Sequence, residues 1–333
     1  MNILVAGGAG FIGSNFVKHV IKKYPSYGVV VLDKLTYAGN LENLKDVDFT
    51  VRYKFVLGDI RSKTDVENAA KGCDVIVNLA AETHVDKSIL QADEFVTTNI
   101  NGVYTLLEYA RNNGTLVLQV STDEVYASIS EGSFNEGAKL NPTSPYSASK
   151  ACGDLLALSF FKTFGTKVVI TRSSNNYGPY QFPEKFIPLC VTNAITGNVL
   201  PVYGNGLNVR DWLYVEDNCE AIDLVLHKGK VGEIYNIGGN NERTNLDIVE
   251  LILRILDKPK SLVTFVKDRV AHDFRYSINC DKIRELGWCP KHNFEDAMKA
   301  TVDWYQQNIS WWAALKERNK TYFNKQYQGV EKV

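Results

Sequence analysis

Short apolar runs alternate with amphipathic stretches through the first half of the chain. The apolar runs have the length of strands and cover residues 3–6, 29–32, 53–60, 75–81, 116–120 and 168–170. Between them, apolar residues recur at helical spacing, and helices are expected over residues 14–21, 65–71, 95–112 and 145–164. This alternation predicts an α/β fold with a doubly wound parallel sheet and right-handed crossovers.

The alternation ends near Gly178, beyond which prolines and aromatic residues become frequent. Helices are still expected over 215–227 and 246–256, and the apolar run at 233–237 predicts a strand that returns to the main sheet. We therefore expect two interleaved domains. Residues 1–177 would bind a dinucleotide, and residues 178–333 would form a smaller substrate lobe over the carboxyl edge of the sheet.

The first apolar run leads directly into a glycine-spaced turn, Gly7-Gly8-Ala9-Gly10-Phe11-Ile12-Gly13, and then into a helix. Glycines let the backbone approach a pyrophosphate, and a helix N-terminus offers free N–H groups and a partial positive charge. The spacing is GxxGxxG rather than GxGxxG, and glycines also mark ordinary turns, so the triplet alone is weak evidence.

An acidic residue strengthens this interpretation. The second apolar run ends at Asp33, about 20 residues after Gly13, where a carboxylate accepts hydrogen bonds from the adenine ribose. Asp33 favours NAD over NADP because a carboxylate repels a 2′-phosphate. Lys34, which follows directly, weakens that preference a little.

Composition excludes several other classes of protein. The formal net charge is −1 over 333 residues, which implies no nucleic-acid partner. No apolar run approaches the roughly 20 residues of a membrane span, and the chain opens on a core strand, so neither a membrane segment nor a signal peptide is expected. The six cysteines are scattered without a CxxC motif. This argues against a metal site or a disulfide framework and predicts a cytoplasmic protein.

Tyr146 and Lys150 lie four residues apart in the helix expected over 145–164, so they share one face. A free tyrosine has a pKa of about 10 and is a poor base at neutral pH. A nearby ammonium group and a positive nicotinamide ring would both lower that pKa, and the phenolate could take a proton from a sugar hydroxyl. A YxxxK pair commonly has no function, but this one follows the fifth strand of a sheet that carries a glycine turn.

Two adjacent carboxylates, Asp123 and Glu124, follow Thr122 at the end of that fifth strand. In isolation they could equally belong to a solvated loop. Ligands bind at this edge of open α/β sheets, however, and an acid–base pair there suits the elimination of water from a sugar. Glu124 would remove H5, and Asp123, if its environment keeps it protonated, would protonate the departing O6. A 4-epimerase of the same fold needs no such pair.

These motifs together resemble the extended short-chain dehydrogenase/reductase family, whose fold is a Rossmann sheet with a C-terminal substrate lobe. The resemblance rests on the glycine turn, residues 33, 59–60, 78–81 and 121, and the YxxxK pair. Within that family, longer stretches are similar to the dTDP-glucose 4,6-dehydratases, namely residues 33–40, 81–86, 121–126, 175–185, 210–217, 235–239 and 286–288. The similarity extends to about residue 308.

The resemblance implies dehydration of dTDP-glucose to dTDP-4-keto-6-deoxyglucose with bound NAD. It implies that the catalytic residues are Thr122, Asp123, Glu124, Tyr146 and Lys150. NAD would be contacted by Gly7, Gly10, Phe11, Ile12, Gly13, Asp33, Lys34, Thr36, Asp59, Ile60, Ala80, Thr98, Tyr146, Lys150 and Asn176. The nucleotide sugar would be contacted by His84, Thr122, Asn175, Lys185, Arg210, Asn245, Arg269 and His272. A homodimer through helices 95–112 and 146–164 is also implied.

Several alternatives stay open. Arg210 could form a structural ion pair with Asp211 or Asp217, and His84 could be a buried core histidine. The tryptophan pair at 311–312 is expected to pack and is assigned no function. A nucleotide-sugar 4-epimerase, a UDP-glucose 4,6-dehydratase and a non-catalytic NAD(H)-binding protein remain alternative functions.

The chain departs from the family pattern in two places. Ala127 stands where the family usually has glycine. Residues 268–273 read Asp-Arg-Val-Ala-His-Asp, where the family usually has Asp-Arg-Pro-Gly-His-Asp. The second departure lies in a stretch expected to bind the nucleotide, so it concerns nucleobase affinity rather than the chemistry.

Overall fold

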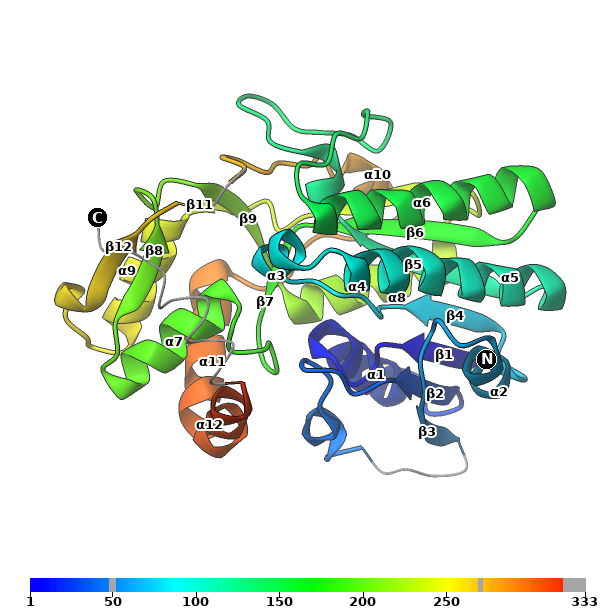
Figure 1. Cartoon of the computed structure of the whole chain (residues 1–333), viewed down its shortest axis with the longest axis horizontal. Coiled ribbons are helices and arrows are strands. Elements are labelled where there is room, and N and C mark those ends of the chain that lie inside the picture. The colour runs from blue at the N-terminus through cyan, green and yellow to red at the C-terminus, as the bar shows by residue number, and fades with distance from the viewer. Residues whose placement is uncertain (48–51, 269–271, 320–333) are drawn as a thin grey trace.

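A seven-stranded sheet forms the larger part of the molecule in a computed structural model that describes residues 1–47, 52–268 and 272–319 (Figure 1). Its strands, in spatial order, are β10 (Ile234–Ile237), β6 (Val168–Ser173), β5 (Leu116–Thr122), β4 (Val75–Asn78), β1 (Asn2–Ala6), β2 (Gly28–Asp33) and β3 (Tyr53–Leu57). All neighbouring strands are parallel. The chain order reverses between β1 and β4, which is the switch point where such sheets bind ligands. The predicted doubly wound fold is confirmed.

Helices cover both faces of this sheet because side chains alternate along each strand. Ile3 and Val5 of β1 face one apolar layer, whereas Leu4 and Ala6 face the other. The first layer includes α1 (Phe11–Lys23) and α8 (Val215–Lys228). The second layer includes α2 (Lys63–Ala70), α5 (Val103–Asn113) and α6 (Pro145–Phe164). Ser144 caps α6 and Gly165 ends it, as the sequence predicted.

The single helix expected over 95–112 is interrupted. After α3 (Val85–Leu90), the chain forms α4 (Asp93–Val96), a π-helical turn (Thr97–Gly102) and then α5. Within the π turn, the amide of Asn99 bonds the N–H and C=O groups of Glu82 (2.9 and 3.0 Å) and the hydroxyl of Ser149 (2.8 Å). These partners lie on other elements, so apolar spacing along the helix could not reveal the wider turn.

The smaller lobe lies beyond the carboxyl ends of the sheet strands, on the left of Figure 1. Its strands form the sheets β11-β9-β7 and β12-β8, with bounds β7 (Asn175–Tyr177), β8 (Leu200–Tyr203), β9 (Val209–Tyr214), β11 (Glu242–Thr244) and β12 (Val263–Val266). Its helices are α7 (Phe186–Thr196), α9 (Asn245–Ile255), α11 (Phe294–Gln307) and α12 (Ile309–Arg318). Of the strands and helices of this lobe, only α9 was predicted. The strands are too short to give a clear pattern, and Pro188 lies in the first turn of α7.

The chain does not stay in the smaller lobe once it has entered it. Helix α8 packs on the large sheet beside α1, and β10 pairs in parallel with β6. The short helix α10 (Asp281–Glu285) then joins the same apolar layer through Ile283. Among the described residues, no helix combines the length and apolar character needed to cross a bilayer.

Candidate active site

A continuous groove follows the carboxyl edge of the large sheet and consists of three adjoining cavities. The inner cavity lies over the glycine turn and the end of β2, the central cavity at the end of β5 beside α6, and the outer cavity beneath the smaller lobe. Gly7 and Gly10 line both the inner and the central cavity. Glu124 and Asn176 line both the central and the outer cavity. A long ligand could therefore extend along the whole groove.

The glycine turn at the inner end packs too closely for side chains. Gly7 has φ 77°, and a Cβ atom there would lie 2.5 Å from the main-chain nitrogen of Ala80. A Cβ atom on Gly13 would collide with the carbonyl group of Gly7. Helix α1 begins at Phe11, and its first three residues line the central cavity. Its first N–H groups have no intrahelical partner, so the turn fits a pyrophosphate.

Asp33 at the end of β2 holds this turn in place. Its Oδ2 accepts the N–H of Ala9 (2.9 Å), and its Oδ1 accepts the N–H of Leu35 (2.8 Å). Burial raises the pKa of Asp33, and these two hydrogen bonds oppose that shift. Asp33 also lines the inner cavity, where its predicted bond to an adenine ribose stays a prediction.

The other predicted cofactor residues all lie in the wall of the groove. Lys34, Thr36, Asp59, Ile60, Ala80 and Thr98 line the inner cavity, and Phe11, Ile12, Gly13, Tyr146, Lys150 and Asn176 line the central one. Although burial acts in the opposite direction, hydrogen bonds from Arg61 and Lys34 lower the pKa of Asp59 to about 2. The ammonium group of Lys34 lies 2.9 Å from the carboxylate of Asp59. The positive charge of Lys34, which weakened the preference for NAD over NADP, is therefore paired with a carboxylate.

Tyr146 and Lys150 both face the central cavity from α6. The Lys150 ammonium group donates to the carbonyl oxygen of Val120 (2.7 Å), and burial lowers the pKa of Lys150 to about 8. Burial, followed by the carboxylate of Glu124, raises the pKa of Tyr146. The expectation that Lys150 lowers the pKa of the phenol is therefore not met by the protein alone. A lowered pKa requires a further positive charge in the cavity, such as a nicotinamide ring.

Asp123 has the environment of a protonated acid. The residue is 2% exposed, and burial, followed by the carboxylates of Glu124 and Asp211, raises its pKa well above the ordinary range. Thr122 donates its hydroxyl to Oδ1 (3.2 Å), whereas Oδ2 has no hydrogen-bond partner among the described residues. Burial and an unpaired oxygen both favour the neutral form of this carboxyl group.

A short 3₁₀ turn, Asp123–Tyr126, aims the two carboxyl groups into the groove. Thr122 caps the turn by accepting the N–H of Glu124 (3.3 Å). Ala127 ends it with φ 79° and ψ −165°, a conformation that glycine adopts readily and alanine does not. The departure of Ala127 from the family pattern thus places backbone strain at the end of the turn that carries the acid–base pair.

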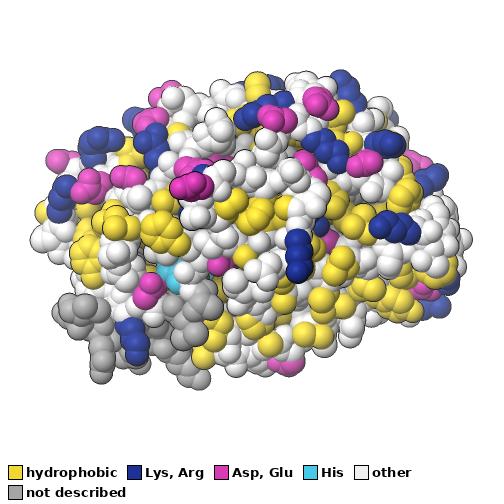
Figure 2. Space-filling view, turned by 90° about the horizontal axis from the view of Figure 1, so that it is seen from above, with side chains coloured by type: hydrophobic (Ala, Val, Ile, Leu, Met, Phe, Trp, Pro, Cys, Tyr) yellow, Lys and Arg dark blue, Asp and Glu magenta, His cyan; other side chains and the backbone are white. Residues whose placement is uncertain are grey.

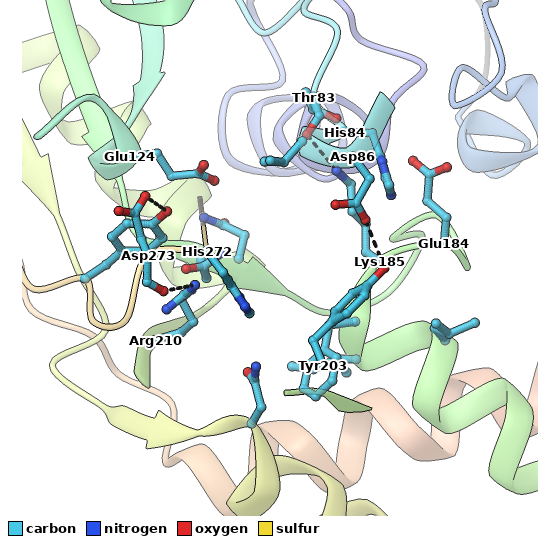
Figure 3. Close-up of a pocket in the computed structure, with 18 of the residues that line it drawn as sticks. Thr83, His84, Asp86, Glu124, Glu184, Lys185, Tyr203, Arg210, His272 and Asp273 are labelled. Atoms are coloured by element: carbon cyan, nitrogen blue, oxygen red, sulfur yellow. Dashed lines mark hydrogen bonds between the residues drawn. The ribbon is translucent and has the colours of Figure 1, made fainter. Parts of the chain in front are cut away.

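Figure 3 shows the outer cavity, which brings together most of the predicted sugar-nucleotide residues. His84, Asn175, Lys185, Arg210, Asn245 and His272 line it, and Thr122 lies in the adjoining central cavity. Arg269 lies outside the described residues, as do Val270 and Ala271 of the second departure.

Arg210 on β9 presents a cation to the outer cavity. Its guanidinium group donates to the main-chain oxygens of Val209 (2.7 Å), Asp273 (2.8 Å) and Phe274 (3.2 Å), and it lies over the ring of Tyr276. Among the described residues, no carboxylate pairs with it. The alternative of an ion pair with Asp211 or Asp217 is therefore wrong. A guanidinium group that is held by carbonyl oxygens has no carboxylate to offset its positive charge, so this charge can attract an anionic ligand.

His84 and Lys185 have structural partners as well as positions in the cavity wall. Nδ1 of His84 accepts the N–H of Lys87 (3.2 Å) and so caps α3. The ammonium group of Lys185 donates to the main-chain oxygen of Thr83 (2.8 Å) (Figure 3). The bond from Lys185 holds the loop after β4 against the start of α7.

Several buried polar atoms in the groove wall lack hydrogen-bond partners among the described residues. They include Oδ2 of Asp123, Oδ1 of Asn175, Oδ1 of Asn176, Oε1 of Gln181 and Nε1 of Trp212. Buried polar groups are almost always paired in folded proteins, because an unpaired group costs free energy. Their concentration along one groove indicates that polar ligands complete the site.

Other residues line the groove that the sequence did not single out for a role, notably Thr83, Asp86, Glu184, Tyr203 and Tyr276. The first three lie in the stretches that resembled the family. Burial raises the pKa of Glu184 to about 7. Tyr203 and Tyr276 had no sequence signal, since β8 and the loop before α10 reach the cavity only through the tertiary fold.

Fold and site together define a nicotinamide-dependent enzyme that acts on an anionic, hydroxyl-rich ligand. The model of a family described as GDP-mannose 4,6 dehydratase matches residues 4–301. The dTDP-glucose 4,6-dehydratase of Streptomyces niveus is 50% identical over 322 residues, which cover 95% of this chain and 96% of that protein. The chain belongs to this family of nucleotide-sugar 4,6-dehydratases.

Solved structures give the same relationship. The dTDP-glucose 4,6-dehydratase of Streptomyces venezuelae, crystallised with NAD, is 50% identical with a TM-score of 0.93, covering 95% of this chain and all of that one (100%). The UDP-glucose 4-epimerase of Thermus thermophilus, also a complex with NAD, is 29% identical with a TM-score of 0.85, covering 92% of this chain and 100% of that one. The fold is thus shared with epimerases, whereas the sequence is nearer to the dehydratases.

Proposed function

We propose that this protein is an NAD-dependent dTDP-glucose 4,6-dehydratase that forms dTDP-4-keto-6-deoxyglucose. The observation that supports this most is the pair of adjacent carboxyl groups, with Asp123 buried and its pKa raised by that burial, and with Glu124 lining both the central and the outer cavity. Dehydration needs a base at C5 and an acid at the C6 hydroxyl, whereas 4-epimerisation leaves C5 and C6 untouched and does not need this pair. Relatives with about half of their residues identical bear the same name.

The protein's own groups provide the proton transfers. NAD, when bound, supplies the oxidation at C4 and the later reduction at C6. Tyr146 takes the proton of the C4 hydroxyl, while the Thr122 hydroxyl turns from Asp123 and donates its hydrogen bond to the same oxygen. The keto group at C4 makes H5 acidic, and Glu124 removes it. Asp123 gives its proton to O6, which departs as water, and C5 is finally reprotonated.

The shape and charge of the groove support an assignment of its two ends to the two ligands. The glycine turn and Asp33 would hold the dinucleotide at the inner end, and Lys150 would hold the nicotinamide ribose beside Tyr146. Arg210, together with Arg269, would bind the sugar-nucleotide diphosphate at the outer end, because guanidinium forks match phosphate oxygens. The division into residues 1–177 and 178–333 is part of the proposal. The strand β10 and the helices α8 and α10 belong to the first domain, and β7, at the boundary, pairs with β9 in the second.

The proposal also includes a homodimer and a cytoplasmic location. Four apolar side chains on α4, α5 and α6 are about half exposed, namely Val96, Tyr104, Leu155 and Phe164. Figure 2 shows hydrophobic side chains on the face that carries α6, which supports an association through these helices. The six cysteines are free, which suits a reducing compartment. Light scattering on the purified protein measures the oligomeric state.

The function is tested by incubating the purified protein with dTDP-glucose in deuterated water without added NAD. We expect loss of one water molecule, a methyl group at C6 and one deuterium at C5, measured by mass spectrometry and NMR. An intact hexose with inverted C4 would move the protein to the epimerases. Conversion of UDP-glucose in place of dTDP-glucose would change the assigned nucleotide.

A further inference from the structure

The C-terminal helix α12 reaches back to the glycine turn through one asparagine. Nε1 of Trp311 donates to Oδ1 of Asn43 (2.9 Å), and Nδ2 of Asn43 donates to the main-chain oxygen of Ala9 (2.9 Å). Asn43 is 1% exposed and lies in a 3₁₀ turn, Leu41–Leu44. Trp311 thus does more than pack, which was the only role expected for it from the sequence.

The partners of Asn43 fix the orientation of its amide. An indole N–H can only donate, and a main-chain oxygen can only accept. The amide oxygen therefore faces Trp311, and the amide nitrogen faces Ala9. An aspartate at this position would keep the bond to Trp311 and lose the bond to Ala9, whereas a leucine would lose both.

Ala9 is held on both sides by this arrangement. Its N–H donates to Asp33, and its C=O accepts from the side chain of Asn43 and from the N–H of Asn40 (3.0 Å). The next residue, Gly10, is the N-cap of α1. The peptide groups flanking Ala9 are therefore fixed immediately before the helix whose N–H groups fit the pyrophosphate.

A second contact from α12 reaches the same side of the groove. Arg318 donates to the main-chain oxygen of Tyr37 (3.0 Å), and Tyr37 lines both the inner and the central cavity. The ring of Trp311 also packs against Tyr180, whose hydroxyl accepts from Lys18 of α1 (2.6 Å). Helix α12 thus bridges the smaller lobe to three segments around the dinucleotide end of the groove.

We infer that Trp311 and Asn43 are positioning residues for NAD, through which α12 keeps the glycine turn in its cofactor-binding form. The functional reason rests on the proposed dehydratase reaction, which returns the cofactor to its starting state in every turnover. Such a cofactor has no need to leave, and a turn fixed before binding holds it more tightly. The two hydrogen bonds from Trp311 to Asn43 and from Asn43 to Ala9, which we call the relay, fix the turn without touching the cofactor.

The test compares two adjacent tryptophans in the full chain. Trp311→Phe keeps an aromatic ring against Tyr180 and removes the donor to Asn43 together with part of the ring. Trp312→Phe is the matched control, since Nε1 of Trp312 donates to Tyr305 (2.8 Å) within the smaller lobe. Both proteins are stripped of nucleotide, and the Kd for NAD is measured by calorimetry without any sugar nucleotide. Hydrogen exchange is followed in peptides that cover residues 7–13.

We expect Trp311→Phe to raise the Kd for NAD about five- to tenfold, the effect of one lost buried hydrogen bond, and Trp312→Phe to leave it unchanged. Exchange in residues 7–13 is expected to speed up in Trp311→Phe alone. At saturating NAD its kcat should equal that of the unaltered protein, because the chemistry is untouched. In an Asn43→Ala background, Trp311→Phe should add no further loss, since the relay is already broken.

Equal NAD affinity and equal exchange in the two tryptophan variants would overturn the inference, as would additive effects of Trp311→Phe and Asn43→Ala. The outcome is separable from the proposed function. A protein whose NAD affinity depends on Trp311 but which leaves dTDP-glucose unchanged would refute the dehydratase and preserve the relay. An active dehydratase with unaltered affinity in Trp311→Phe would refute the relay alone.

Discussion

Replacing Asp123 by asparagine tests whether this residue is a neutral acid in the folded protein. Asparagine has nearly the shape of a protonated carboxyl group and can still accept the Thr122 hydroxyl at Oδ1. It cannot give a proton to O6. The substitution should therefore leave the fold intact while removing the acid of the elimination step.

The stability effect has a definite sign. The pKa of Asp123 is raised in the folded state, so the folded protein keeps its proton after the unfolded chain has released it. The stability of the unaltered protein then falls as pH rises above the unfolded value of about 3.9, by about 1.4 kcal/mol per pH unit. In Asp123→Asn, no group at this position releases a proton on unfolding, so this fall in stability with rising pH is absent. Between pH 5 and pH 7, the free energy of unfolding of the variant should therefore rise relative to that of the unaltered protein, over the pH range in which folded Asp123 keeps its proton.

Urea unfolding at pH 5, 6 and 7 measures this difference. A difference that stays constant with pH would show that Asp123 is ionised in the folded state and would refute the reasoning. In the activity assay, dehydration should fall by about 10²–10⁴-fold, the usual contribution of a general acid.

Solvent deuterium distinguishes the acid from the base. Substrate recovered from Asp123→Asn should carry deuterium at C5, because Tyr146 and Glu124 still act. Glu124→Gln is the matched control and should give neither product nor deuterium at C5. Deuterium at C5 in Glu124→Gln would mean that another residue removes H5.

Three further predictions concern Tyr146, Lys150 and Ala127. Tyr146→Phe should lower turnover about 10²–10⁴-fold and abolish deuterium uptake at C5, measured by NMR; uptake at the normal rate would contradict its role as base. Lys150 is 6% exposed with its pKa lowered to about 8, so the unaltered protein should gain on the order of 3 kcal/mol in unfolding free energy as pH rises from 8 to 10.5. Lys150→Met should lose that gain and the activity, whereas the exposed Lys162→Met should keep both. Ala127→Gly should stabilise the protein by about 1 kcal/mol in urea unfolding, because φ 79° suits glycine; a destabilised variant would show that Ala127 is unstrained.

Local physical rules were sufficient for the strands of the first half of the chain and for the turn after β1. The apolar runs that became β1 to β6 are buried on both faces of a parallel sheet, so they appear in the sequence as continuous hydrophobic segments. Gly7 and Gly13 could be assigned to a close turn because only glycine tolerates that approach. The spacing of Tyr146 and Lys150 placed both on one helical face, which the structure turns toward the central cavity.

The sequence by itself therefore determined the sheet, the glycine turn and the candidate acid–base pair, since each depends on residues that are near neighbours in the chain. Only the tertiary structure decided what depends on distant contacts. The π turn follows from the bonds of Asn99 to Glu82 and Ser149, and the uncompensated charge of Arg210 follows from carbonyl oxygens of residues 273–274. The bond from Trp311 through Asn43 to the glycine turn spans nearly the whole chain, and no periodicity or motif records a hydrogen bond between residues so far apart.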